Sequence, residues 1–340
     1  MYEKFFHLQK SPFGMTPDPS CLMMTESHRE ALSGLLYAVH KRKGFVVLTG
    51  DAGTGKTTLL RALIRSAKSA RFSVVLNPTL SLPEFFELVL CDFGITDVPE
   101  SKAQRIMKLQ EFLVKLHNEG APPVLIVDEA HKLSPEILEE IRLLTNFETA
   151  EKKLLHIVLA GQTELKALLN REDLRQLKQR IEIRLEIKPL SAADVTTYMR
   201  HRWDRAGGTT ALPFTKDAIA LVVSASRGIP RLVNSICDNA LLLAFGEADS
   251  AVTARHMREV LRDLDLGVGS PPPVERKSMS AETPRRSESP AAFSRLEPQS
   301  LMTLPSIERY LSPIPKLSVF RRLGSWLNFG NLRTVRTNSE

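Results

Sequence analysis

Cysteine is scarce in this chain: its 340 residues include three, Cys21, Cys91 and Cys237, and no two of them are close in sequence. Three widely separated cysteines can form neither a disulfide framework nor a metal site made of cysteines alone. We expect reduced, mostly buried thiols. No apolar run approaches the roughly 20 residues that cross a bilayer. The first six residues also lack the basic-then-apolar pattern of a signal peptide. We therefore expect the chain to stay in the cytosol.

A large excess of one charge is also missing from most of the chain. Lys and Arg number 46 against 39 Asp and Glu, a formal net charge of +7. Eleven of the basic and only six of the acidic residues follow Leu266. The pI of about 9.3 therefore belongs mainly to the C-terminal segment, and by itself it does not indicate nucleic-acid binding.

Short β-branched runs alternate with helical patterns as far as about residue 188, which is typical of a parallel sheet built from βαβ units. The runs are almost continuously apolar, as expected for a sheet covered on both faces. The expected strands are Phe45–Thr49, Ser73–Asn77, Val124–Asp128, Leu155–Ala160 and Arg184–Ile187. The helices expected between them are Lys56–Ala70, Leu82–Leu90, Gln104–Asn118 and Pro135–Phe147.

Only helical patterns follow Ser191. The expected helices are Ala192–Arg205, Lys216–Ser224, Pro230–Phe245 and Ala254–Asp263. Ser191, Thr215 and Thr253 stand at N-cap positions, and only the first, with Asp194 three residues on, suits a capping box. The sequence therefore predicts a small helical domain after the sheet.

The segment from Gly267 onward has a different composition, with nine of the 21 prolines and many serines. Such a segment buries too little apolar surface to offset its ordering entropy, so we expect disorder. One amphipathic patch, residues 316–329, combines Trp326 and other apolar residues with Arg321 and Arg322. It suits a weak peripheral membrane contact, a partner-binding segment, or an incidental cluster.

One segment fits the phosphate-binding pattern G-x-x-x-x-G-K-[ST] and stands between an expected strand and an expected helix. It consists of Gly50, Asp51, Ala52, Gly53, Thr54, Gly55, Lys56 and Thr57. Its glycines let successive N–H groups point at phosphate oxygens, and the helix N-terminus adds a favourable dipole. Lys56 is predicted to supply a positive charge for the β- and γ-phosphates, and Thr57 a hydroxyl ligand for Mg²⁺. Thr58 is also predicted to bind the nucleotide. The weaker interpretation is a glycine-rich turn without a nucleotide.

A second signal is the apolar strand that ends in Asp128 and Glu129. In a protein with such a loop, Asp128 would position Mg²⁺ through its water shell, and Glu129 would orient and polarise the attacking water. An apolar run followed by these two residues is common by chance. In combination with the loop it makes hydrolysis plausible rather than binding alone.

Four further polar residues follow at places where they could reach a nucleotide. Gln162 ends the next strand and could contact the γ-phosphate or water; the alternative is an exposed turn residue. Arg175 or Arg180, before the last strand, could reach the phosphates of a neighbouring subunit; the alternative is a solvated basic face. Arg231, at the start of a helix, could sense the γ-phosphate; the alternative is a capping turn.

Together these landmarks resemble an AAA+ ATPase core, and more narrowly the general secretion pathway protein A (ExeA-like) group. The resemblance covers roughly residues 1–265. It also rests on Met1–Phe6, Pro12–Gly14, Thr16–Pro19, His28–Leu32, Val127–His131, Gly161–Leu165, Gln179–Ile181 and Gly228–Arg231. ATPases of transposition systems resemble the chain too, less closely in the opening residues.

The resemblance implies a parallel sheet of order 5-1-4-3-2, binding of ATP with Mg²⁺, and nucleotide-dependent self-assembly. It implies that Gln162 is the first sensor, Arg180 the arginine that acts in trans, and Arg231 the second sensor. The segment from Pro12 to His28 would border the adenine. We expect a P-loop domain over 1–189, a helical lid over 190–266 and a basic tail over 267–340.

The leading functional hypothesis is an ATPase that couples turnover to assembly or remodelling of a larger complex, such as an envelope secretion or export system. Its partners would be further copies of itself and an unidentified protein client. The alternative is an ATP-dependent DNA-binding regulator of transposition. A third possibility is a scaffold that binds ATP as a switch with little turnover.

Overall fold

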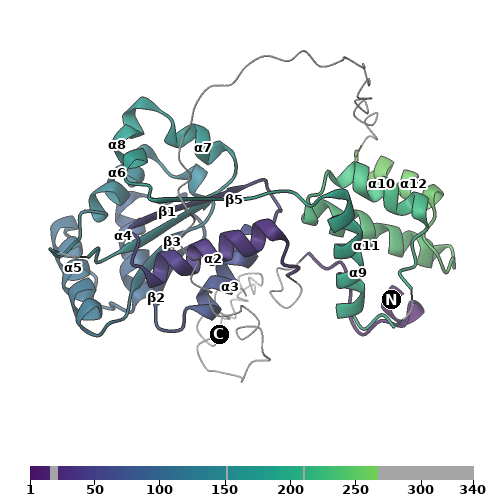
Figure 1. Cartoon of the computed structure of the whole chain (residues 1–340), viewed down its shortest axis with the longest axis horizontal. Helices are drawn as coiled ribbons and strands as arrows, with labels where there is room; N and C mark the ends of the chain where they lie inside the picture. The colour runs from purple at the N-terminus through teal and green to yellow at the C-terminus, as the bar shows by residue number, and fades with distance from the viewer. Residues whose placement is uncertain (16–21, 151, 210, 267–340) are drawn as a thin grey trace, which may run out of the picture. The chain divides into compact units, whose positions relative to one another are not determined.

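The computed structural model describes residues 1–15, 22–150, 152–209 and 211–266 (Figure 1). Cys21, the tail from residue 267 and its patch at 316–329 lie outside these ranges. None of the described helices is long and apolar enough to cross a membrane.

Five parallel strands form one sheet, in the order β2-β3-β4-β1-β5. This order confirms the predicted 5-1-4-3-2 arrangement. The strands are β1 (Phe45–Gly50), β2 (Arg71–Val75), β3 (Pro123–Val127), β4 (His156–Gly161) and β5 (Ile183–Ile187). Because all five run the same way, their carboxyl ends meet at one edge of the sheet and their amino ends at the other.

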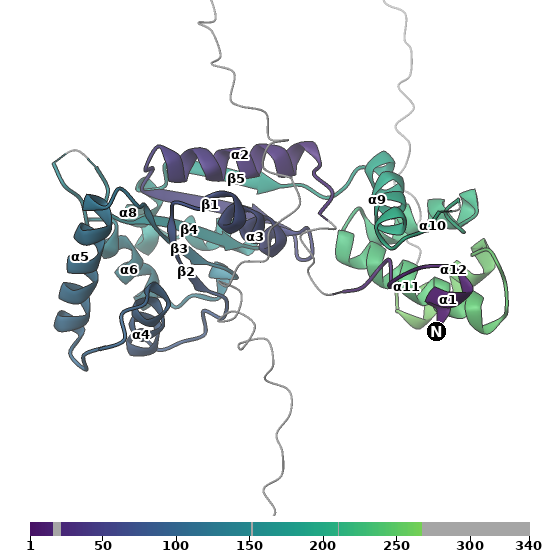
Figure 2. The ribbon, with the colours of Figure 1, turned by 90° about the horizontal axis from the view of Figure 1, so that it is seen from below.

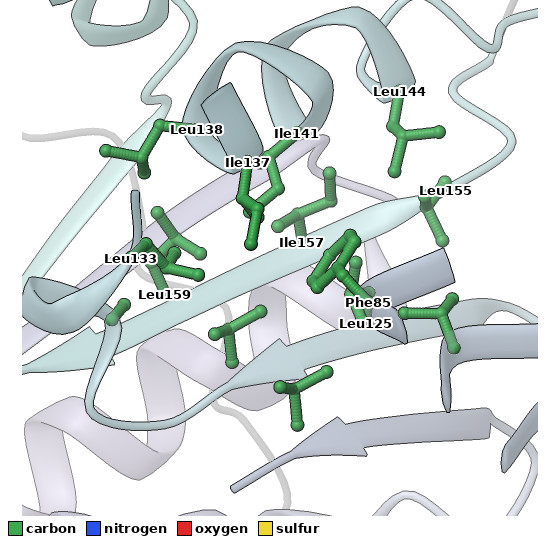
Figure 3. Close-up of a cluster of buried hydrophobic side chains, with 14 of the residues drawn as sticks. Phe85, Leu125, Leu133, Ile137, Leu138, Ile141, Leu144, Leu155, Ile157 and Leu159 are labelled. Carbon is green, nitrogen blue, oxygen red and sulfur yellow. The ribbon is translucent and has the colours of Figure 1, made fainter. Parts of the chain in front are cut away.

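Both faces of the sheet are covered, because successive side chains of each strand point to opposite faces. In β3, Val124 and Ile126 pack under α2 (Glu26–His40) and α3 (Lys56–Ser66). Leu125 and Val127 pack on the other face, under α4 (Leu82–Phe93), α5 (Lys102–Asn118) and α6 (Pro135–Leu144). Figure 2 shows α2 and α4 on opposite faces of the sheet. Figure 3 shows Ile137 and Ile141 of α6 directed at Ile157 of β4.

The element boundaries differ from the predicted ones by a few residues. Strand β2 begins at Arg71 rather than Ser73, because Arg71 already pairs with Pro123 of β3. Helix α3 ends at Ser66 rather than Ala70, since a short turn leads from Ala67 into β2. Among the described residues, four elements beyond the predicted ones are present in addition to α2: α1 (Tyr2–Phe5), α7 (Glu164–Leu169), and the short 3₁₀ turns η2 (Ala130–Lys132) and η3 (Glu172–Leu174). Helix α8 (Arg175–Gln179) is the arginine-bearing helix that the resemblance implied.

Four helices follow the sheet and share a second hydrophobic core. They are α9 (Ala192–Arg205), α10 (Lys216–Ser226), α11 (Pro230–Gly246) and α12 (Ala254–Asp263). The N-terminal residues Tyr2, Phe6, Leu8 and Phe13, including helix α1 (Tyr2–Phe5), belong to the same core. The predicted domain boundary at residue 189 stays a prediction. The N-terminal residues as far as Phe13 pack with the helices that follow the sheet.

Two local expectations need correction. Thr253 and His256 form a capping box at α12, although a histidine at the third position was not expected to fit one. Cys91 is exposed, whereas Cys237 is buried as expected. Ser191 with Asp194 forms the predicted capping box, and Thr215 caps α10.

Candidate nucleotide-binding site

The turn between β1 and α3 has the backbone form that its glycines permit. Gly53 and Gly55 have φ angles of +81° and +99°, in the region that favours glycine. A Cβ on Gly53 would lie 2.6 Å from the Cβ of Arg231, so the loop also needs glycine to accept its neighbour. The turn leads directly into α3, whose first N–H groups are available for an anion.

Lys56 is 5% exposed and its ammonium lies against the loop. Its Nζ donates to the carbonyl oxygens of Gly50 and Asp51, at 2.8 and 2.9 Å. Burial lowers the pKa of Lys56, and the carboxylates of Glu129 and Asp128 act in the opposite direction. These carboxylates therefore favour the charged form that a phosphate needs.

Thr57 and Asp128 come together from different elements. The Thr57 hydroxyl donates to Oδ2 of Asp128 at 2.6 Å, and the Glu129 N–H donates to Oδ1 at 2.9 Å. Asp128 is 3% exposed. A hydroxyl and a carboxylate side by side are hard oxygen ligands of the kind that Mg²⁺ takes. The donor set therefore fits this ion.

Glu129 adopts a left-handed backbone conformation, with φ of +53°, which is uncommon for a residue other than glycine. Its Oε2 accepts a hydrogen bond from Nε2 of Gln162 at 3.3 Å. His131 Nε2 and Lys132 Nζ each lie 3.6 Å from the same oxygen. The end of β4 and the turn after β3 thus hold the Glu129 carboxylate between them.

The side chain of His28 in α2 contacts the backbone of the loop. Its Nε2 lies 3.1 Å from the carbonyl oxygen of Thr54. Because a carbonyl only accepts, Nε2 carries the proton and Nδ1 accepts from the Thr25 hydroxyl. Burial lowers the pKa of His28, although the bond to Thr54 opposes the shift. The neutral ring therefore fits this place.

A cavity of about 430 Å³ joins these groups, within the range of ligand sites. Most of the predicted site residues line it: Ala52, Gly53, Thr54, Gly55, Lys56, Thr57, Thr58, Glu129, Gln162 and Arg231. Gly50, Asp51 and Asp128 contact lining residues from outside the cavity wall. Gly14, Met15, Leu22, Met23 and His28 also line it, where the resemblance implied that the segment Pro12–His28 would border the adenine.

The helical side of the cavity carries a polar network that the sequence did not predict. Arg202 is 8% exposed and donates through Nε to the Pro12 carbonyl oxygen at 2.6 Å and through Nη2 to that of Gly14 at 3.0 Å. Its Nη1 lies 3.3 Å from the Tyr198 hydroxyl, which donates to Oδ1 of Asn234 at 3.0 Å. No sequence motif marks Arg202, Tyr198 or Asn234, and the network joins three segments that are far apart in the chain.

The predicted arginines occupy different environments. The Arg231 N–H donates to the Gly53 carbonyl oxygen at 3.3 Å, so the start of α11 touches the loop. Arg180, at the end of α8, donates from Nη1 to Oγ1 of Thr145 at 3.2 Å. Arg175 is exposed at the start of α8. Neither Arg175 nor Arg180 is among the described residues that line the cavity of their own chain.

Comparisons with known proteins agree with this geometry. Residues 39–169 match the family described as AAA domain. The chain is 41% identical over 254 residues to general secretion pathway protein A of Aeromonas hydrophila, covering 74% of this chain and 46% of that protein. It is 25% identical over 256 residues to the ATP-dependent target DNA activator B of Escherichia phage Mu, covering 74% and 76%. The chain thus spans less than half of the first of these relatives.

Two solved structures share the fold. Cdc6p from Pyrobaculum aerophilum matches with a TM-score of 0.57 and 18% identity, over 74% of this chain and 70% of that one. The ORC2 protein of Aeropyrum pernix matches with a TM-score of 0.57 and 14% identity, over 75% and 72%. At this identity they support the parallel-sheet architecture alone.

Proposed function

Because this chain is an AAA+ P-loop protein similar to general secretion pathway protein A, we propose that it binds ATP with Mg²⁺ and hydrolyses it. We further propose that turnover drives assembly or remodelling of a larger complex. The proposal rests on two contacts beside the loop of Lys56. The Thr57 hydroxyl lies 2.6 Å from a carboxylate oxygen of Asp128, and the Gln162 side-chain nitrogen lies 3.3 Å from a carboxylate oxygen of Glu129.

The loop N–H groups and the Lys56 ammonium would bind the β- and γ-phosphates, and Thr57 and Asp128 would hold Mg²⁺. The ion, when bound, neutralises charge on the phosphate oxygens. Glu129 would accept a proton from the attacking water and orient it. Gln162, which donates a hydrogen bond to Glu129, would keep that carboxylate oriented toward the attacking water. Catalysis of this kind consists mainly of positioning and charge stabilisation.

Substitution of Glu129 tests the hydrolytic part of the proposal. Glu129→Gln should still bind a fluorescent ATP analogue, while steady-state phosphate release falls by about 10²- to 10⁴-fold, the usual contribution of a positioned general base. Lys56→Ala should lose nucleotide binding. Glu136→Gln, an exposed carboxylate on α6, is the matched control and should behave as the wild type. Full turnover in the Glu129→Gln protein would contradict the assigned role.

A second candidate function, an ATP-dependent DNA-binding regulator, is favoured by the similarity to the phage Mu target DNA activator. Its sequence identity is lower, and the covered length is about the same as for the secretion relative. ATP-dependent association with duplex DNA across a salt series distinguishes the two functions, because phosphate contacts give a steep salt dependence.

A further inference from the structure

The amino ends of the strands carry a concentration of positive charge that the overall composition hides. We call this group the basic edge and define it by six residues, Lys41, Arg42, Lys43, Lys68, Arg71 and Lys153. They lie in or beside the turns that lead into β1, β2 and β4. A strand of five or six residues, roughly 17–20 Å long, separates them from the phosphate-binding loop at the opposite edge.

Hydrogen bonds between these turns join them into one surface. The Arg71 N–H donates to the Pro122 carbonyl oxygen at 2.9 Å, ahead of β3. Arg42 donates from Nη2 to the carbonyl oxygen of Gly120 in the same turn at 3.0 Å, and its Nη1 lies 2.9 Å from Nδ1 of His117. The basic edge therefore continues from β2 past the turn before β3 to the turn before β1.

The surface extends to β4 through Lys43 and Lys153. The Lys43 carbonyl oxygen lies 2.9 Å from Nδ1 of His156, the first residue of β4. A Cβ on Gly44 would lie 3.2 Å from Cγ of Lys153. Since β2, β3, β4 and β1 are consecutive in the sheet, the basic edge spans three strand spacings, or roughly 14 Å.

Its charge is only partly neutralised within the chain. Lys43 pairs with Glu182 at 3.3 Å, and Lys153 pairs with Glu148. Lys41, Lys68 and Arg71 are exposed and form no ion pair with any described residue. The hydrogen-bond partners of Arg42 are a histidine nitrogen and a backbone carbonyl oxygen, so its charge also remains uncompensated by a carboxylate.

We propose that the basic edge binds the phosphate backbone of duplex DNA, at a surface separate from the nucleotide cavity; this inference rests on the second candidate function, DNA binding. A row of cations about 14 Å long, laid along the duplex, covers the length of helix axis over which one strand carries roughly four phosphates, since each strand has one charge per about 3.4 Å of axis. A single acidic side chain would satisfy one of these cations, whereas a polyanion satisfies several. The turns themselves contribute Ser69, Gly120 and Pro122, which are not the large apolar side chains that anchor a protein in a membrane.

Because the contacts are to phosphates, binding should be independent of base sequence and sensitive to salt. The test is fluorescence anisotropy of a labelled random-sequence duplex, titrated with the full-length protein at several salt concentrations. Lys41→Ala/Lys68→Ala/Arg71→Ala should bind at least about tenfold more weakly. Its slope of log affinity against log salt should be shallower by about three, one for each phosphate contact removed.

A matched control removes the same charge from exposed positions outside the sheet, as Lys4→Ala/Lys216→Ala/Arg258→Ala. It should bind DNA as the wild type does. The tail cations are present in all three proteins, so the difference between the two variants reports the basic edge. ATP turnover without DNA should be equal in all three, which distinguishes this proposal from the proposed ATPase activity.

Protection from acylation, followed by mass spectrometry, locates the contact directly. Duplex DNA should protect Lys41 and Lys68 of the wild type and leave Lys4 and Lys216 reactive. The proposal is wrong if the wild-type protein does not bind DNA, if both triple variants lose affinity equally, or if DNA leaves Lys41 and Lys68 reactive. It is also wrong if the basic-edge variant keeps its affinity for DNA and loses only binding to phosphatidylglycerol vesicles.

Discussion

Glu129 and Gln162 meet although they end different strands, β3 and β4, and their contact places two predicted side chains beside the same cavity. The sequence predicted that both would lie at strand ends. It did not predict the left-handed backbone of Glu129, the nearby His131, or the support that His28 gives to the loop. Side-chain contacts of this kind depend on neighbours that are distant in sequence, and no local pattern encodes them.

His28 provides a prediction about pH. Its folded-state pKa lies below the ordinary value, about 6.5 in unfolded chains, because the ring is buried. The unfolded state therefore takes up the proton first, so stability is complete above about pH 6.5 and declines as the pH falls toward the folded-state pKa. In thermal melts from pH 7.5 to 5, His28→Gln should reduce this decline, by at most about 1.4 kcal/mol per pH unit.

His40→Gln is the matched control, because His40 is exposed at the end of the same helix. It should melt as the wild type does at every pH. The buried His156, whose pKa is also lowered by burial and by the charge of Arg42, should leave a residual decline in His28→Gln. An unchanged pH dependence in His28→Gln would show that this ring does not contribute.

At the scale of single elements, α12 shows how a polar cluster can serve a cap rather than a metal. Glu247, Asp249 and His256 place one ligand atom each within 4.8 Å of one another. The Thr253 N–H donates to Nδ1 of His256 at 3.0 Å, and Nε2 lies 2.8 Å from the carboxylate of Glu247. The Arg255 guanidinium lies 3.0 Å from the same Nε2, pairs with Glu247 and lies 3.6 Å from Asp249. A side-chain cation of the chain therefore already stands among these groups.

We predict that His256→Ala destabilises α12 by about 1–3 kcal/mol, because it removes a cap partner and a fully buried side chain. Hydrogen exchange of the α12 amides measures this effect locally. Thr253→Ala should cost about 1 kcal/mol, the usual value for a lost cap. Added Zn²⁺ or EDTA should leave the exchange unchanged; protection by Zn²⁺ would instead support a metal centre.

At the scale of the whole molecule, Arg180 raises the question of self-assembly. Its side chain bonds to Thr145 and is not among the described residues that line the cavity of its own chain. This placement is compatible with the proposed action on a neighbouring copy. Arginines of this kind contribute about 10³- to 10⁵-fold to turnover in related chemistry.

Arg180→Ala should therefore keep ATP affinity and lose about 10³-fold in turnover. Mixed with the Glu129→Gln protein, it should regain part of its activity, because some sites then combine an intact Glu129 with an intact Arg180 from the other protein. Phosphate release at rising total concentration measures this recovery. Arg175→Ala, the exposed neighbour on the same helix, is the comparison, and recovery that requires Arg175 instead would reassign the role. No recovery in any mixture would favour action within one chain.

The sequence by itself determined the phosphate-binding loop, the acidic strand end and the alternation of strands and helices. These features are local, since a glycine pattern fixes a turn and apolar periodicity fixes an element. The sheet order followed from the resemblance to a known family. The tertiary structure alone decided which further side chains converge on the predicted ones. His28, Arg202 and Asn234 reach the cavity from separate segments, and the basic edge exists because parallel pairing places the amino ends of the strands side by side.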